Sequence, residues 1–111
     1  MRRSDLGEFE EVVLLAVAVL SPQAYSVVIA DELERETGQT VSTGAVHAAL
    51  QRLETKGYLR SVLGEATPER GGRRKRLFTM TPLGGRVLTE VQAVRSRFWE
   101  RIAQKTIFTL S

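Results

Sequence analysis

The sequence contains no cysteine, which excludes disulfide bonds and thiolate-ligated metal sites. Its one histidine, His47, has no second metal ligand at a suitable spacing, so we expect neither a metal ion nor a cofactor. No nucleophile or carboxylate pair stands out, which argues against an enzyme. The longest apolar run, Val12 to Leu20, has nine residues and is too short to cross a bilayer. The acidic residues before it are unlike the basic start of a signal peptide, and we expect a cytoplasmic protein outside the membrane.

The rest of the composition is that of an ordinary globular protein. The 111 residues are 42% hydrophobic and 26% charged, enough for one domain with an appendage. The net charge of +3 is unevenly distributed: residues 1–40 hold three basic and eight acidic side chains (−5), and residues 41–111 hold thirteen basic and five acidic ones (+8). This asymmetry indicates a polyanionic partner for the C-terminal two-thirds of the chain. Five cations fall within seven positions there: Arg70, Arg73, Arg74, Lys75 and Arg76.

Three helices are predicted in the first half of the chain. Residues 8–20 are apolar on most sides, and residues 27–37 form an amphipathic pattern that Gly38 ends. Ser42 is a favoured N-cap for a third helix, which ends at Gly57. Because only a few residues separate the second helix from the third, the pair has the signature of a helix-turn-helix.

The third predicted helix has two different faces. Val46, Leu50 and Leu53 recur at helical spacing and form an apolar face that we expect in the core. The opposite face is small or polar, carries no acidic residue, and is therefore suited to a partner. It consists of Gly44, His47, Ala48, Gln51 and Thr55.

A β-hairpin and a fourth helix are predicted in the second half. Residues 58–63 and 73–81 alternate between the two faces of a strand, and a loop after Gly64 separates them. Thr81 and Pro82 are typical of a helix start, and we expect the last helix to run from there to about Phe108. Its first turn contains Gly84-Gly85, a pair that weakens a helix.

The order helix, helix, helix, hairpin, helix predicts a mainly α (α+β) fold, a winged helix-turn-helix with a two-stranded wing and an extra C-terminal helix. We assign residues 1–81 to a DNA-binding domain and residues 82–111 to a C-terminal dimerisation helix. The last helix carries an apolar stripe that a twin subunit would cover most simply. The expected dimer-interface residues are Val87, Val91, Val94, Phe98, Trp99 and Ile102.

The chain resembles the PadR family of bacterial transcriptional regulators over most of its length. The resemblance lies in LGEFEEVVLLAV (residues 6–17), AYSVVIADEL (24–33), VSTGAVHAALQRLETKGYL (41–59) and GGRRKRLFTMTPLGG (71–85). It implies a dimeric winged-helix protein, usually a repressor, bound to a partly palindromic operator. It also implies a dimer formed mainly by the last helices, with a contribution from the first. In some members of the family, a small and often aromatic molecule binding near that interface releases the DNA.

Two positions depart from the family pattern. His47 stands where the family commonly has tyrosine, and Ser26 stands where it commonly has glycine. A histidine can still donate a hydrogen bond to a phosphate or a base edge. A hydroxyl group at a helix N-terminus suits a phosphate.

The expected DNA contacts fall into base-reading and phosphate-binding groups. The start of the third helix would enter the major groove, where glutamine can pair with adenine and threonine can touch a thymine methyl group. An ordinary solvated surface, or for Tyr25 a partly buried anchor, is the competing interpretation. The base-reading candidates are Thr43, Gly44, His47 and Gln51, and Ser42 just before them is a further candidate for DNA contact. The phosphate-binding candidates are Tyr25, Ser26, Arg52, Lys56, Arg73, Arg74, Lys75 and Arg76.

The predicted function is that of a sequence-specific regulator, a repressor that binds double-stranded operator DNA as a homodimer. Phe98 and Trp99 are candidates for the aromatic wall of an effector pocket between the two last helices, although interface packing is the simpler account of Trp99. Two alternatives stay open: a winged-helix adaptor that binds other proteins, and a nucleic-acid binder without sequence preference.

Overall fold

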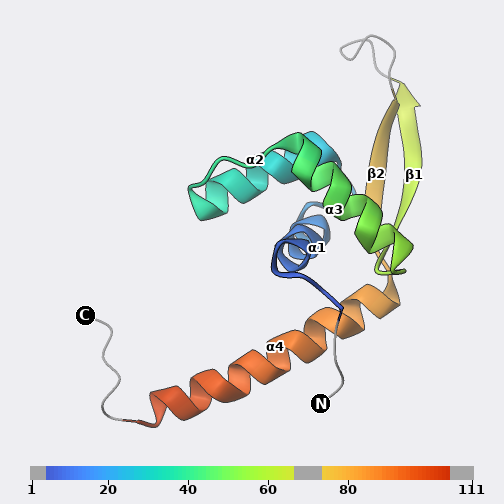
Figure 1. Ribbon diagram of the computed structural model, residues 1–111. Helices are drawn as coiled ribbons and strands as arrows, with labels where there is room; N and C mark the ends of the chain where they lie inside the picture. Colours follow the sequence, from blue (N-terminus) through green and yellow to red (C-terminus); the bar gives the residue numbers. More distant parts are fainter. Residues whose placement is uncertain (1–4, 67–73, 106–111) are drawn as a thin grey trace.

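Helix α1 (Glu8–Leu20) lies at the centre of the structure (Figure 1). The computed structural model describes residues 5–66 and 74–105. Helices α2 (Ser26–Thr37) and α3 (Thr43–Thr55) both lie on one side of α1. The three helices predicted from the sequence are therefore confirmed, and the second begins one residue earlier than expected.

The apolar face of α3 packs into the core, as predicted. Val46, Leu50 and Leu53 are inaccessible to solvent, and burial of each such side chain contributes about 1.5–3 kcal/mol relative to exposure. Ser42 is the N-cap, because its hydroxyl oxygen accepts a hydrogen bond from the Ala45 N–H at 3.0 Å. Local sequence therefore sets both the start of α3 and the face that it buries.

The turn between α2 and α3 is fixed by backbone geometry and one side chain. Gly38 adopts a left-handed conformation with φ of 72°, the usual glycine end of a helix. The carboxylate of Glu34 accepts a hydrogen bond from the Val41 N–H at 2.9 Å. This contact spans the turn and holds the entry of α3 against the last turns of α2.

The predicted hairpin is present, and its first strand is longer than expected. Strand β1 (Leu59–Ala66) pairs antiparallel with β2 (Arg74–Met80), and the register is interrupted between Leu63 and Ala66. The expected end of the strand at Gly64 was wrong, because this glycine marks an irregularity within the strand. A Cβ atom there would lie 3.2 Å from the Leu77 side chain. Residues 67–73, where the sequence predicts a loop between the two strands, lie outside the described residues.

Helix α4 (Pro82–Ala103) starts at the base of the hairpin and passes along the other side of α1 (Figure 1). Thr81 caps it as predicted, since its hydroxyl oxygen accepts from the Gly84 N–H at 3.1 Å. The helix ends at Ala103, earlier than predicted. The sequence did not reveal this end, because no proline or glycine follows to mark it. The expected end at Phe108 lies outside the described residues.

Gly84 has a packing role that the sequence did not suggest. It is buried, and a Cβ atom at this position would lie only 2.4 Å from the carbonyl oxygen of Tyr58. The absence of a side chain thus lets the first turn of α4 approach the hairpin backbone closely. The glycine therefore has two effects: it weakens the first turn of α4, and it allows that turn to pack against the hairpin.

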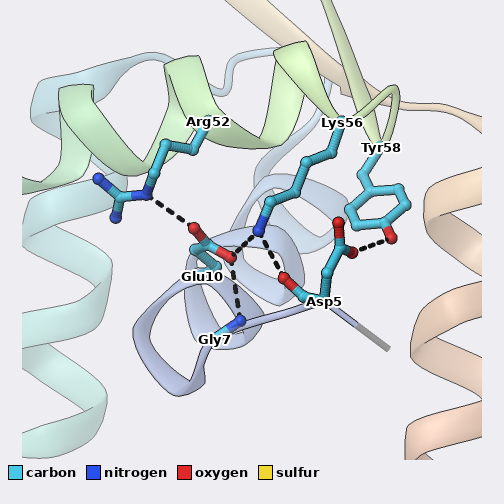
Figure 2. A network of polar contacts seen from close by, with 6 residues as sticks. All are labelled: Asp5, Gly7, Glu10, Arg52, Lys56 and Tyr58. Atoms are coloured by element: carbon cyan, nitrogen blue, oxygen red, sulfur yellow. Dashed lines mark hydrogen bonds and ion pairs between the residues drawn. The ribbon is translucent and has the colours of Figure 1, made fainter. Parts of the chain in front are cut away.

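A charged network holds α3 against α1 (Figure 2). The Glu10 carboxylate is buried in α1 and accepts hydrogen bonds from Arg52 Nε at 2.7 Å, Lys56 Nζ at 2.7 Å and the Gly7 N–H at 2.9 Å. Burial raises the pKa of Glu10, but the hydrogen bonds from Lys56, Gly7 and Arg52 together outweigh it and lower the pKa to about 2. Glu10 is therefore an anion at neutral pH.

Asp5 extends the network to the start of the hairpin. Lys56 Nζ also donates to its backbone carbonyl oxygen, and the Tyr58 hydroxyl group donates to its carboxylate, as Figure 2 shows. The residues before α1 are thereby joined to the end of α3 and to the residue preceding β1. Two segments more than fifty positions apart in the sequence meet at these contacts.

We expect the substitution Glu10→Gln to reduce the free energy of unfolding at pH 7 by an amount on the order of 2 kcal/mol. The pKa of Glu10 is lower in the folded protein (about 2) than its ordinary value of 4.5. Its stabilising effect is therefore fully present above pH 4.5 and is lost as the pH falls toward 2. Urea unfolding followed by circular dichroism should show the two proteins converging over that range.

The matched control is Glu32→Gln, which removes the exposed pair between Glu32 and Arg35. Exposed pairs contribute roughly 0–1 kcal/mol, so this variant should lose little stability. Equal losses for the two variants at pH 7 would contradict the role given to Glu10.

Candidate nucleic-acid interface

The outer face of α3, defined here as Thr43, Gly44, His47 and Gln51, is exposed to solvent. No atom lies within 4 Å of the place where a Cβ atom of Gly44 would stand, so the surface is open at this point. The four predicted base-reading residues thus share one surface at the N-terminal half of the helix. Ser42 is used locally as the N-cap.

Arg52 and Lys56 lie farther along the same helix and are engaged within the chain. With Gln51 they border a shallow surface depression of about 360 Å³. Both donate to Glu10, and their side chains are 53% and 24% exposed, respectively. Phosphate binding by these two residues stays a prediction. Their role in holding α3 could not be found in the sequence, because Glu10 lies more than forty positions away.

The start of α2 lies beside the β1–β2 hairpin, which forms the wing. Tyr25 is the N-cap residue of α2, and Ser26 is its first residue. Lys75 of β2 places its Nζ atom 4.5 Å from the centre of the Tyr25 ring, within the range of a cation–π interaction. The N–H of Phe78 in the same strand donates to the Ala24 carbonyl oxygen at 2.9 Å. A helix N-terminus, which favours anions, and a lysine therefore lie side by side.

Two arginines of the wing are exposed, and the guanidinium group of each donates a hydrogen bond to strand β1. Arg74 Nε donates to the Gly64 carbonyl oxygen at 2.9 Å, and Arg76 Nη1 donates to the Ser61 hydroxyl oxygen at 3.0 Å. Since they are two residues apart in a strand, they lie on the same face of the hairpin, opposite to Lys75. Arg70 and Arg73, also predicted as cations of the wing, lie outside the described residues.

The acidic side chain of α3 and the carboxylate of Glu10 both have partners within the chain. Glu54 accepts a hydrogen bond from the Ser61 hydroxyl group at 2.8 Å, and Glu10 is buried beneath the helix. The outer face of α3 itself carries no carboxylate. Its composition is therefore compatible with a closely approaching polyanion.

The apolar stripe predicted on the last helix is present on α4. Phe98 and Trp99 are 57% and 58% exposed, and Val91, Val94 and Ile102 are half-buried. Val87 lies closer to the hairpin and packs partly against the core of its own chain.

Two kinds of site were sought in the described part of the chain: a cluster of metal-ligand side chains and a membrane-spanning helix. Residues 5–66 and 74–105 bring together no group of three histidine, aspartate or glutamate side chains that could hold a metal ion. Over the same residues, no helix is both long and apolar enough to span a membrane.

Solved structures share this fold. A PadR-like transcription factor from Bacteroides fragilis is 22% identical with a TM-score of 0.70, and the match covers 86% of each chain. A PadR family transcriptional regulator from Eggerthella lenta is 23% identical with a TM-score of 0.65, over 87% of this chain and 84% of that one. Streptococcus pneumoniae FabT in complex with DNA is 22% identical with a TM-score of 0.69, over 96% of this chain and 66% of that one. Such identities establish the fold alone, and they confirm the predicted winged helix.

The sequence itself, apart from the fold, also identifies a family. No curated protein matches the chain. The sequence profile of the transcriptional regulator PadR-like family, however, matches residues 14–90, from the middle of α1 into α4. Members of this family are transcriptional regulators and not enzymes, which agrees with the prediction from the sequence. The chain belongs to the PadR-like family of transcriptional regulators.

Proposed function

We propose that this protein is a sequence-specific DNA-binding regulator that acts as a homodimeric repressor in the cytoplasm. The observation that carries the proposal is the outer face of α3, which is exposed, polar and free of carboxylates beside a cationic wing. In this proposal α3 is the recognition helix and enters the major groove of an operator. The likeness to a structure of FabT in complex with DNA supports a role of this kind for the fold.

The wing and the start of α2 supply affinity without sequence preference. Arg74, Lys75 and Arg76 are cations on one hairpin, and Tyr25 and Ser26 stand at a helix N-terminus next to Lys75. Cations and helix N-termini bind phosphate groups, and each neutralised phosphate releases counterions. These groups position the protein on the duplex and leave base selection to α3.

The outer face of α3 selects the bases. Gln51 can form two hydrogen bonds with adenine, and Thr43 can contact the methyl group of thymine. His47 donates to a base edge or a phosphate in place of the tyrosine common in the family. Gly44 has no side chain that would hold the helix away from the groove.

A second copy of the chain covers the apolar stripe of α4 and sets the distance between the two recognition helices. The two-fold symmetry of such a dimer matches a pseudo-palindromic operator. Phe98 and Trp99, both exposed on the stripe, form one wall of a site for a small aromatic effector. An effector that binds the dimer differently in its free and DNA-bound states changes operator affinity.

The double substitution Arg74→Ala and Arg76→Ala should weaken binding to operator and random DNA alike, because phosphates are common to both. In a plot of log affinity against log salt, the slope should fall in magnitude by about 0.9 for each phosphate that the variant no longer neutralises. Fluorescence anisotropy with DNA from upstream of the protein's own gene, between about 50 and 200 mM salt, measures both quantities.

The charge-matched control is Arg86→Ala with Arg97→Ala, which removes two exposed arginines of α4. This control should keep the native slope. A selective loss of operator binding in the wing variant would contradict its assignment to phosphates.

The substitution Gln51→Ala should instead relax base selection. We expect a loss of about 1–3 kcal/mol of discrimination at one base pair in each half-site, with little change in binding to random DNA. Competition with a set of singly substituted operator fragments measures this. Gln104→Ala, at the exposed end of α4, is the control and should keep the native preferences.

Two outcomes would overturn the proposed function. Equal native affinity for upstream and random DNA at matched salt would indicate a non-specific nucleic-acid binder. Absence of salt-sensitive binding to any duplex would indicate an adaptor for other proteins.

A further inference from the structure

Helix α1 carries two adjacent buried carboxylates that bind different elements. Glu10 and Glu11 are 6% and 8% exposed. Glu10 accepts hydrogen bonds from Arg52 and Lys56 of α3. Glu11 forms an ion pair with Arg95 of α4, 84 positions away in the sequence. Neighbouring residues of one helix are thus bound to the recognition helix and to the helix of the proposed dimer interface.

Hydrophobic packing attaches α4 to its own subunit at one end. Gly84 is its only fully buried residue within the described part of the chain, and Val87 and Leu88 pack partly against the core. Beyond Leu88 the described residues of α4 are half-buried or exposed. Figure 1 shows the helix leaving the hairpin, passing α1 and extending beyond it.

Arg95 adds an attachment at a distance from that packed end. It lies seven residues after Leu88, roughly two turns and 10 Å along the helix axis. A rod held at one end can pivot, whereas a rod held at two separated points has a fixed direction. The Glu11 side chain is only 11% exposed, so departure of Arg95 would leave a buried carboxylate without this partner, which is costly.

We propose that the Glu11–Arg95 ion pair sets the direction of α4 relative to the head, meaning α1 to α3 with the wing. Glu11 and Arg95 are then positioning residues for DNA binding. They touch no DNA, but they fix where the partner subunit's recognition helix lies. The inference about the direction of α4 depends only on contacts within one subunit. The consequence for operator binding rests on the proposed function.

The direction of α4 can be measured directly, because the native chain has no cysteine to interfere with labelling. We would introduce Glu36→Cys on α2 and Ala103→Cys at the end of α4, both exposed positions, and attach spin labels. Double electron–electron resonance on this chain, mixed with an excess of unlabelled native chain, reports the distance within one subunit. We expect a single narrow distribution.

Arg95→Met and Glu11→Gln should each broaden or shift that distribution, because either change removes the ion pair. Arg95→Lys keeps a cation and should restore most of the native distribution. The control is Arg97→Met, which removes an exposed arginine from the same helix. An unchanged distribution in Arg95→Met, or equal broadening in Arg97→Met, would overturn the proposal. Circular dichroism spectra identify any variant that fails to fold, and Glu11→Gln then provides the independent test.

A second measurement concerns the operator. Inserting one base pair at the centre of the upstream site rotates one half-site by about 35° and moves it by about 3.4 Å. The native protein should bind the original fragment more tightly than the insertion by a factor of about five or more. Arg95→Met should reduce that ratio toward one, while Arg97→Met keeps it.

The two measurements separate the two proposals. Native protein that shows one narrow distance but binds no DNA would overturn the proposed function and leave the role of the ion pair standing. Loss of the narrow distance in Arg95→Met with an unchanged affinity ratio would overturn the operator consequence alone.

Discussion

The buried carboxylate of Glu10 is the contact on which the proposed DNA-binding surface depends. It joins α1 to Arg52 and Lys56 of α3, and these hydrogen bonds keep it charged by lowering its pKa to about 2. A buried anion with three donors tolerates few alternative positions of the helix that supplies two of them. The apolar face of α3 provides most of the attraction to the core, and the hydrogen bonds to Glu10 fix the orientation of the helix. Apolar packing and these hydrogen bonds together hold the outer face of α3 in one position.

Charge is divided accordingly within the molecule. The acidic N-terminal part supplies internal partners, among them Glu10, Glu11 and Glu34, for cations and backbone groups of other elements. The basic part supplies the cations of these pairs, Arg52, Lys56 and Arg95, and also the exposed arginines of the wing. Once these internal ion pairs are formed, the basic part of the −5 against +8 asymmetry still has exposed cations, and these are the ones that the proposed function directs at DNA. Two consecutive glutamates of α1 further couple the recognition helix and α4 to one rigid element.

Local patterns in the sequence predicted the helices, the hairpin and the outer face of α3, because periodicity and the Ser42 cap depend on nearby residues. Long-range contacts could not be predicted in this way. Glu10 and Glu11 look like ordinary acidic residues of a first helical turn, and only the folded chain reveals their partners. Gly84 looks like a helix breaker until the Tyr58 carbonyl oxygen is placed against it. The outer face of α3 could thus be predicted, because it depends on residues close together in the sequence. The hydrogen bond from Lys56 to Glu10 could not, because the two residues are 46 positions apart.

The most direct test of the account is protection of guanine N7 from methylation, since this atom lies in the major groove. The probe is the duplex upstream of the protein's own gene, with native protein bound. Two recognition helices of one dimer predict two protected clusters with two-fold symmetry, centred about 10 base pairs, or a multiple of that distance, apart on the same side of the duplex. Binding with no protection in the major groove, or with protection spread evenly along the duplex, would contradict a DNA-reading role of α3.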